Sequence, residues 1–202
     1  MNRKISIIGA GGHAKVVIEI AELLKYDISG VFDQNKDIQS ILNYPVSNTF
    51  RKSDEGNVFY ALGSNLKRKK NAQDFGTPNI NLIHPNAVVS KRTEIGMGNV
   101  IMAGAIVNSS VIIGSNCIIN TGAIVDHDCH IGDYVHISPG VAMAGNVTVK
   151  EGAQVGIGAC VKQNLTIGEW SVVGAGAVVI SDVPPNVVVV GNPARYLKPN
   201  NV

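Results

Sequence analysis

Cysteine is scarce in this chain of 202 residues. The three cysteines, Cys117, Cys129 and Cys160, lack the paired spacing of a disulfide framework or a zinc clip, which fits packing roles in a reducing compartment. Uninterrupted apolar runs of about 18 residues are absent as well. The first apolar stretch breaks at glycine without a signal-type cleavage site. These absences predict a cytoplasmic protein that does not span a membrane.

The chain also lacks a large excess of charge of either sign. The formal net charge is +2, and the longest basic run is Lys67-Arg68-Lys69-Lys70. Binding to nucleic acid or to an anionic membrane needs a larger basic patch than this. We therefore expect neither as a partner, and the length of the chain leaves room for an enzyme.

The most informative feature of the sequence is a six-residue period. Aliphatic side chains occupy every sixth position, in a register that runs from 83 to 184 without a slip. A helix would drift off this period within two turns. The repeated positions are Ile83, Val89, Ile95, Ile101, Val107, Ile113, Ile119, Val125, Ile131, Ile137, Met143, Val149, Val155, Val161, Ile167, Val173 and Val179. Each hexapeptide is thus one short strand and one turn, three hexapeptides make one coil of a triangular prism, and the stretch gives between five and six coils.

Side chains just before each inward residue should point outward from this prism. Taken one coil at a time, the outward positions make one face wholly apolar, whereas the other two faces include polar residues. The apolar residues are Val88, Ile106, Ile124, Ala142, Cys160 and Val178. A continuous exposed apolar stripe signals a partner surface, and closed threefold packing would cover it without polymerising. The pattern predicts a homotrimer.

Residues 1–80 are predicted to form a small α/β domain ahead of the repeat domain, residues 81–202. Strands are expected over 4–8, 28–33 and 58–62, with helices over 14–25 and 66–75. Three strands make half of a Rossmann fold, which favours one nucleotide over NAD.

The glycine turn after the first strand is the candidate phosphate site. Gly9, Gly11 and Gly12 would let backbone N–H groups and the helix N-terminus approach a phosphate. Asp33, about 20 residues further on, sits where an acid reaches a ribose hydroxyl. His13 either contacts phosphate or caps the helix. The alternative for this G-x-G-x-x-A pattern is tight packing of strand against helix.

Together the two halves resemble the bacterial sialic acid O-acetyltransferase type of sugar acyltransferase, in particular its nucleotide-linked 4-amino-sugar N-acetyltransferases. The likeness covers nearly the whole chain. Its motifs are GAGGHAKVV at the first turn, Ala61-Leu62-Gly63-Ser64-Asn65 with Arg68, Leu82-Ile83-His84-Pro85, Val125-Asp126-His127-Asp128-Cys129, Tyr134-Val135-His136-Ile137-Ser138, Ala144-Gly145-Asn146-Val147, and Val190-Gly191-Asn192-Pro193-Ala194-Arg195.

This resemblance implies a left-handed β-helix and acetyl transfer from acetyl-CoA, bound between neighbouring prisms. The acceptor implied is a sugar whose nucleotide is held by the N-terminal domain, with Gly63, Asn65 and Arg68 as candidate contacts. His127 matches the general base of the family. Asp128 matches a residue that is glutamate in some amino-sugar members, which favours an amine as the acceptor.

The residues themselves suit this chemistry. An imidazole with a pKa near 6.5 can take the proton that an attacking amine loses, so His127 is the candidate base and Asp128 its neighbour. Gly145 lies three hexapeptides later, in the same column one coil along, where its N–H can stabilise an oxyanion. His136 lies half a coil round the prism from His127, so the two can share a site only across a threefold interface. There we expect His136 to bind the acetyl carbonyl.

Late residues are candidates for the rest of acetyl-CoA. Gly174, Gly176 and Arg195 would line its pantetheine and phosphate ends, although a corner-forming role explains the two glycines equally well. No residue has the features of a covalent acyl carrier, which favours direct transfer through a ternary complex.

Three alternatives remain at this point. The first is an O-acetyltransferase acting on a free sugar or sialic acid. The second is a metal hydratase that would use residues 126–130 as zinc ligands, although we expect no metal because the spacing differs and the nucleotide domain would be unexplained. The third is a non-catalytic scaffold that senses a nucleotide. The sequence is compatible with UDP, dTDP or GDP.

Overall fold

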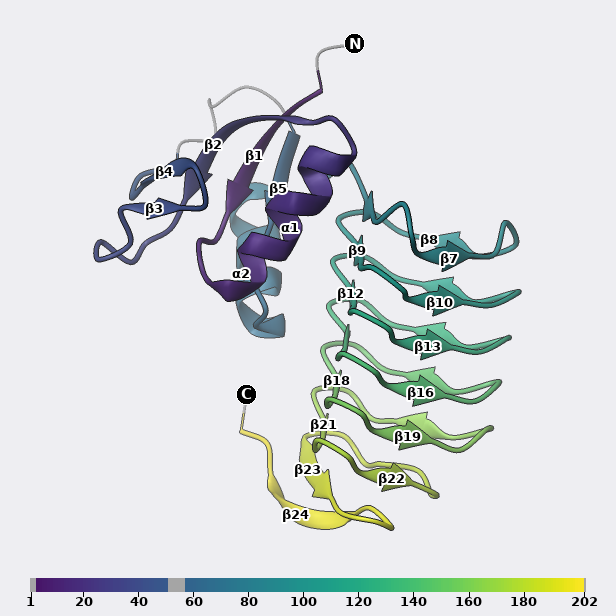
Figure 1. The fold of residues 1–202 in the computed structure, drawn as a ribbon. Coiled ribbons are helices and arrows are strands. Elements are labelled where there is room, and N and C mark those ends of the chain that lie inside the picture. Colours follow the sequence, from purple (N-terminus) through teal and green to yellow (C-terminus); the bar gives the residue numbers. More distant parts are fainter. Residues whose placement is uncertain (1–2, 51–56, 202) are drawn as a thin grey trace.

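The computed structural model describes residues 3–50 and 57–201 and consists of an α/β unit beside a tall prism (Figure 1). The N-terminal unit contains β1 (Lys4–Ile8), α1 (Gly12–Leu23), β2 (Asp27–Phe32), β3 (Ser40–Ile41), β4 (Tyr44–Ser47), β5 (Asn57–Tyr60) and α2 (Asn65–Phe75). Neither helix has the length and apolar character needed to cross a membrane.

The sheet of the N-terminal unit has the order β3-β4-β2-β1-β5. β1 lies in the middle and pairs in parallel with both β2 and β5, as expected for a half-Rossmann unit. The expectation of three strands was wrong, because β4 extends the sheet beside β2 and β3 turns back on it. These two strands are short, and Pro45 sits within β4, so the segment lacks the alternating apolar pattern that predicts a strand.

The repeat region forms two-residue strands stacked in three parallel ladders. We name the faces by their strands. The covered face consists of β6 (Leu82–Ile83), β9 (Val100–Ile101), β12 (Ile118–Ile119), β15 (His136–Ile137), β18 (Gln154–Val155) and β21 (Val172–Val173), and continues into β23 (Val187–Val190) and β24 (Arg195–Pro199). The apolar face consists of β7 (Val88–Val89), β10 (Ile106–Val107), β13 (Ile124–Val125), β16 (Ala142–Met143), β19 (Cys160–Val161) and β22 (Val178–Val179). The third face consists of β8 (Glu94–Ile95), β11 (Ile112–Ile113), β14 (His130–Ile131), β17 (Thr148–Val149) and β20 (Thr166–Ile167).

The predicted left-handed parallel β-helix is confirmed. Each strand pairs with the equivalent strand of the next coil, as Ile106 does with Ile124, and the aliphatic residues at the six-residue period fill the interior. Every sixth residue from Gly98 to Gly176 has a positive φ, which turns the chain at each corner of the triangle. Gly, Asn and Asp occupy most of these corners because their side chains tolerate this backbone conformation best.

The N-terminal unit packs on the upper part of the covered face (Figure 1). Outward side chains there, Leu82, Val100 and Ile118, are buried in one cluster with the core of the α/β unit. Below them the next outward residue of the ladder is His136. His136 therefore lies at the lower edge of the contact between the N-terminal unit and the prism.

Candidate active site

His127 lies at the corner that follows β13, between the apolar face and the third face. Its Nδ1 is 2.7 Å from Asp128 Oδ2, and the two side chains are 60% and 57% exposed. Adjacent residues in a strand point to opposite sides, but Asp128 has φ 59° at the corner, which brings the two side chains together. The predicted pair therefore meets because of the corner.

Two carboxylates surround His127. The hydrogen bond to Asp128 is the main cause that raises the pKa of His127 above 6.5, and the charge of Asp126 adds to it. Asp126 accepts hydrogen bonds from Asn108 Nδ2 and from the His127 backbone N–H, both 2.8 Å long, and these bonds lower its own pKa. Asp126 is thus held as a carboxylate that fixes the corner.

Gly145 lies directly against the His127 ring. A Cβ added at Gly145 would be 2.6 Å from His127 Nε2, so any larger residue would displace the imidazole. Neither His127 Nε2 nor the Gly145 N–H has a hydrogen-bond partner within residues 3–50 and 57–201. A nitrogen that can accept a proton, His127 Nε2, and a free N–H donor, that of Gly145, therefore lie at the same solvent-exposed corner.

His136 lies elsewhere, in a buried polar cluster under the N-terminal unit. Its Nε2 is 3.0 Å from Asn120 Nδ2, and its ring centroid is 6.5 Å from that of His13 at the start of α1. Burial, with help from the charge of Arg68, lowers the pKa of His136 to about 3 and that of His13 to about 4. Both imidazoles are neutral near pH 7, so each has one donor and one acceptor nitrogen.

Two nitrogens of this cluster, His13 Nε2 and His136 Nδ1, are buried and form no hydrogen bond with the described residues. The nearby backbone of Gly63 partly opposes the lowering of the His136 pKa. Within one chain the structure does not bring His136 to His127. His136 is on the covered face, whereas His127 is at the opposite edge of the prism.

The glycine turn occupies the end of β1. Gly11 is the N-cap residue of α1, and side chains added at Gly11 or Gly12 would meet no atom within 4 Å, so the helix N-terminus is open. Asp33 closes the turn instead of standing free: one oxygen accepts the Ala10 N–H at 2.7 Å. Its other oxygen accepts the Asn35 N–H at 2.9 Å.

Beside Asp33 lies a cavity of about 210 Å³. Three aromatic rings line this cavity. They come from the end of β2, from Phe50 and from the end of α2, and the sequence did not single them out. Phe32, Phe50 and Phe75 meet edge to face, with ring centroids 5.1 and 5.3 Å apart. No spacing in the sequence links these positions, so only the fold reveals the cluster.

Arg68 and Asn65 do not reach this cavity. The Arg68 side chain is 2% exposed, and its guanidinium donates to main-chain carbonyls and to Asn65 Oδ1. Asn65 Nδ2 donates to the carbonyls of Gly152 and Ala153. Both side chains are therefore used for bonds within the chain, and their expected contact with substrate stays a prediction. Gly63, the third residue expected to contact substrate in this segment, has open space at its Cα, because an added Cβ would meet no atom within 4 Å.

The late residues have structural roles that the sequence left open. Gly176 is a corner residue with φ 65°, and Gly174 packs so closely on Val190 that an added Cβ would lie 2.7 Å from Cγ1. Arg195 begins β24 and donates to the Ala194 carbonyl at 2.9 Å. Their contacts with acetyl-CoA remain predictions.

Residues 126–130 do not converge on a point. Cys129 is buried inside the prism and its thiol is 3.3 Å from the Ala144 carbonyl oxygen, whereas His130 is exposed on the third face. No cluster of three or more His, Cys, Asp or Glu side chains with metal-binding geometry occurs in the part of the chain that the structure describes.

Two family models match the chain. The PglD N-terminal domain matches residues 4–75, and a model of six bacterial transferase hexapeptide repeats matches residues 110–145. The curated UDP-N-acetylbacillosamine N-acetyltransferase of Bacillus subtilis is 42% identical over 113 residues, which cover 50% of this chain and 52% of that enzyme. The match to this relative thus spans about half of its length.

Solved structures match nearly the full chain. PerB from Caulobacter crescentus, in complex with CoA and GDP-perosamine, is 40% identical with a TM-score of 0.87, and the match covers 96% of this chain and 97% of PerB. The acetyltransferase domain of PglB from Neisseria gonorrhoeae is 39% identical with a TM-score of 0.87, and the match covers 97% of this chain and 100% of that domain.

The geometry at the corner predicts how His127 titrates. Replacing Asp128 with Asn removes the acceptor that stabilises the imidazolium, so the pKa of His127 should fall towards 6.5. A titration of the histidine ring carbons by NMR measures this value. The control, Glu94→Gln, removes a carboxylate from β8 and should leave the titration unchanged. An unaltered pKa in Asp128→Asn would contradict the pairing.

Proposed function

The chain belongs to the family of hexapeptide-repeat acetyltransferases that act on nucleotide-linked amino sugars, and on this basis we propose that it acetylates the 4-amino group of such a sugar. In this proposal residues 1–80 hold the nucleotide, residues 81–202 hold acetyl-CoA, and His127 is the general base. The observation that carries the proposal is the exposed His127–Asp128 pair, with its free nitrogen over Gly145.

The proposed reaction is direct attack of the sugar amine on the thioester carbonyl. As the C–N bond forms, the amine loses a proton to Nε2 of His127, while Nδ1 stays bonded to Asp128. The carbonyl oxygen becomes an oxyanion, which the Gly145 N–H is placed to stabilise. Collapse of this intermediate breaks the C–S bond, and the thiolate of CoA takes the proton back from His127.

The position of His127 supports an acceptor that is delivered by another subunit. The N-terminal unit of the same chain lies against the covered face, whereas His127 is on the edge away from it (Figure 1). We propose that a second copy packs on the apolar face, whose outward residues include Val88 at 63% and Ile124 at 39% exposure. Threefold repetition of this contact gives a closed homotrimer with three active sites.

The same packing provides a place for acetyl-CoA. From the second coil onward, the corner residue of the edge between the covered face and the apolar face is glycine: Gly104, Gly122, Gly140, Gly158 and Gly176. Asn or Asp could also adopt the left-handed backbone conformation at these corners. The use of glycine alone therefore has a second effect, because it leaves this edge without side chains. We propose that the pantetheine arm runs along this edge, with His136 near the acetyl end and Arg195 near the phosphates.

The first prediction of this proposal concerns the acceptor and the base. Thiol release from acetyl-CoA should occur with one member of a panel of UDP-, dTDP- and GDP-linked 4-amino sugars. His127→Ala should lower kcat by about 10²–10⁴-fold, which is the usual contribution of a general base. The matched control is His130→Ala, an exposed histidine nearby on β14, which should keep the native rate. Turnover only with sialic acid or another hydroxyl acceptor would overturn the proposal in favour of O-acetylation.

The second prediction concerns assembly. Ile124→Asp places a charge on the apolar face, so the trimer should dissociate in analytical ultracentrifugation and activity should be lost with it. Ile112→Asp is the matched control, because Ile112 has the same place in its strand on the third face and a similar exposure of 40%. Native chains that sediment as monomers would refute the trimer.

The third prediction concerns sharing of the site. His127→Ala and His136→Ala should each be inactive as pure proteins. When they are unfolded, mixed and refolded together, some interfaces pair an intact His127 with an intact His136, and part of the activity should return. Mixed trimers without any recovered activity would show that the two histidines do not act across an interface.

A further inference from the structure

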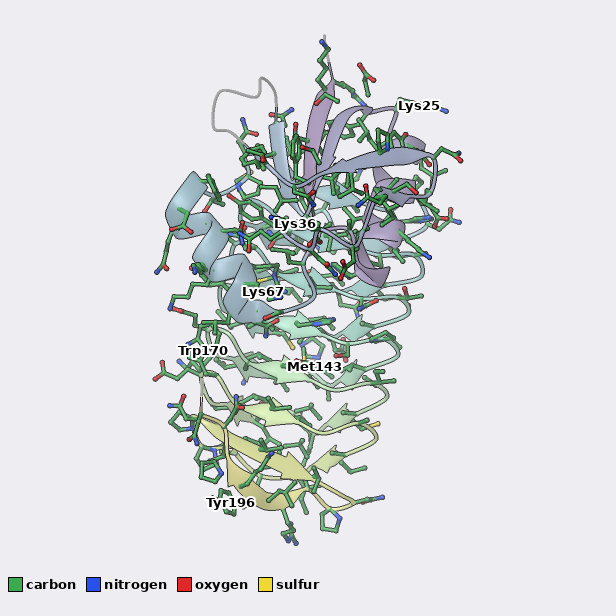
Figure 2. All side chains as sticks on the ribbon, turned by 90° about the vertical axis from the view of Figure 1, so that its left-hand side faces the viewer. Lys25, Lys36, Lys67, Met143, Trp170 and Tyr196 are labelled. Atoms are coloured by element: carbon green, nitrogen blue, oxygen red, sulfur yellow. The ribbon has the colours of Figure 1, made fainter. Side chains whose placement is uncertain are left out.

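The first turn of α2 lies along one vertical edge of the prism, between the third face and the covered face. In Figure 2 Lys67 marks this turn and Trp170 lies below it. Four successive corner residues of this edge, which we call the docking column, are Asn116, Tyr134, Gly152 and Trp170. Each follows the preceding one by a full coil, so their carbonyls repeat at the spacing of the coils.

These carbonyls are left out of the ladders. Within the described residues, the carbonyls of Asn116, Tyr134 and Gly152 accept no backbone hydrogen bond, because the left-handed corner turns them away from the neighbouring coil. A buried carbonyl without a partner is costly. Arg68 Nε donates to Asn116 at 2.8 Å and Arg68 Nη2 to Tyr134 at 2.8 Å, while Asn65 Nδ2 donates to Gly152 at 2.9 Å.

The same guanidinium also holds the N-terminal unit. Arg68 Nη1 donates to the carbonyls of Leu62 and Gly63 at 3.0 and 3.1 Å. These two residues form the turn after β5, and the Gly63 carbonyl lies near His136. One side chain thus joins this turn, α2 and two successive coils of the prism.

The chemistry of this contact suits a side chain that orients the N-terminal unit better than one that mainly stabilises its attachment. No carboxylate among the described residues forms an ion pair with Arg68, and burial lowers its pKa to about 10. Burying a cation among neutral acceptors is an expensive way to attach a helix, which apolar packing would attach at lower cost. A planar fork of five donors, however, fixes orientation as well as distance. Lysine has three donors on a flexible stem and does not reproduce it.

We infer that Arg68 is a positioning residue, whose contacts with the docking column hold the acceptor-carrying N-terminal unit at one fixed place on the prism. This inference rests on the proposed function. Each N-terminal unit is attached to its own prism and delivers the sugar to a neighbour's His127, so a small shift at α2 moves the amine away from the thioester. Displacements of about 1 Å cost catalysis on the order of 10²-fold.

The test separates binding from transfer. In Arg68→Lys, kcat should fall about 100-fold. The dissociation constants of CoA and of the nucleoside diphosphate of the active acceptor, measured by calorimetry, should change less than about threefold because each half-site is intact. Lys67→Ala, an exposed neighbour on the same helix, is the control and should match the native enzyme in all three quantities. Asn65→Ala should act in the same direction and serves where Arg68→Lys folds poorly.

Two results would overturn the inference. A weakened nucleotide affinity with native kcat would make Arg68 a substrate-binding residue, and a lowered melting temperature with native kcat would make it purely structural. Hydrogen exchange gives a readout without turnover: the amides of α2 should exchange faster in Arg68→Lys than in Lys67→Ala. If the native chain acetylates no acceptor, the proposed function fails, while equal exchange in the two variants would refute the docking role itself.

Discussion

The left-handed corner at every sixth residue is the constraint on which the rest of the structure depends. It closes each coil into a triangle, so that the aliphatic ladder fills the interior. It also turns the corner carbonyls out of the ladders, which leaves a column of carbonyls without backbone partners along each of the three edges, within the described residues. The three columns have different residues and different roles. One is all glycine, one contains Asp128 and Asn146, and one is bonded to α2.

The proposed catalytic pair is a product of the same constraint. In a regular strand His127 and Asp128 would point to opposite sides of the sheet. The positive φ of Asp128 brings its carboxylate to the imidazole, and the coil repeat puts Gly145 under the ring. Aspartate serves twice at this position, because its short side chain tolerates the left-handed backbone and still reaches Nδ1. A glutamate would reach further but would adopt the corner less readily.

The sequence predicted those features that repeat or that follow from spacing along one chain. The six-residue period is local and uninterrupted, so the prism, its inward ladder and the column shared by His127 and Gly145 could all be derived. Contacts between distant segments could not. The bonds from Arg68 to Asn116 and Tyr134 depend on how α2 docks, and a basic run on a helix otherwise indicates a solvated face. Likewise, the β3–β4 hairpin and the three phenylalanines carry no pattern of their own.

The buried Arg68 also fits the proposal that the reaction is divided between subunits. The N-terminal unit covers its own prism on the side away from its own His127, so flexible attachment would leave the sugar free to sample many positions. In the proposed trimer, a rigid attachment would place the amine at the same distance from the thioester in every active site. Neutral imidazoles at His13 and His136 fit this arrangement, because burial lowers the pKa of both side chains and the charge of the adjacent guanidinium adds to this effect. Burial and the charge of Arg68 together therefore keep these two imidazoles uncharged where acceptor and acetyl donor are proposed to meet.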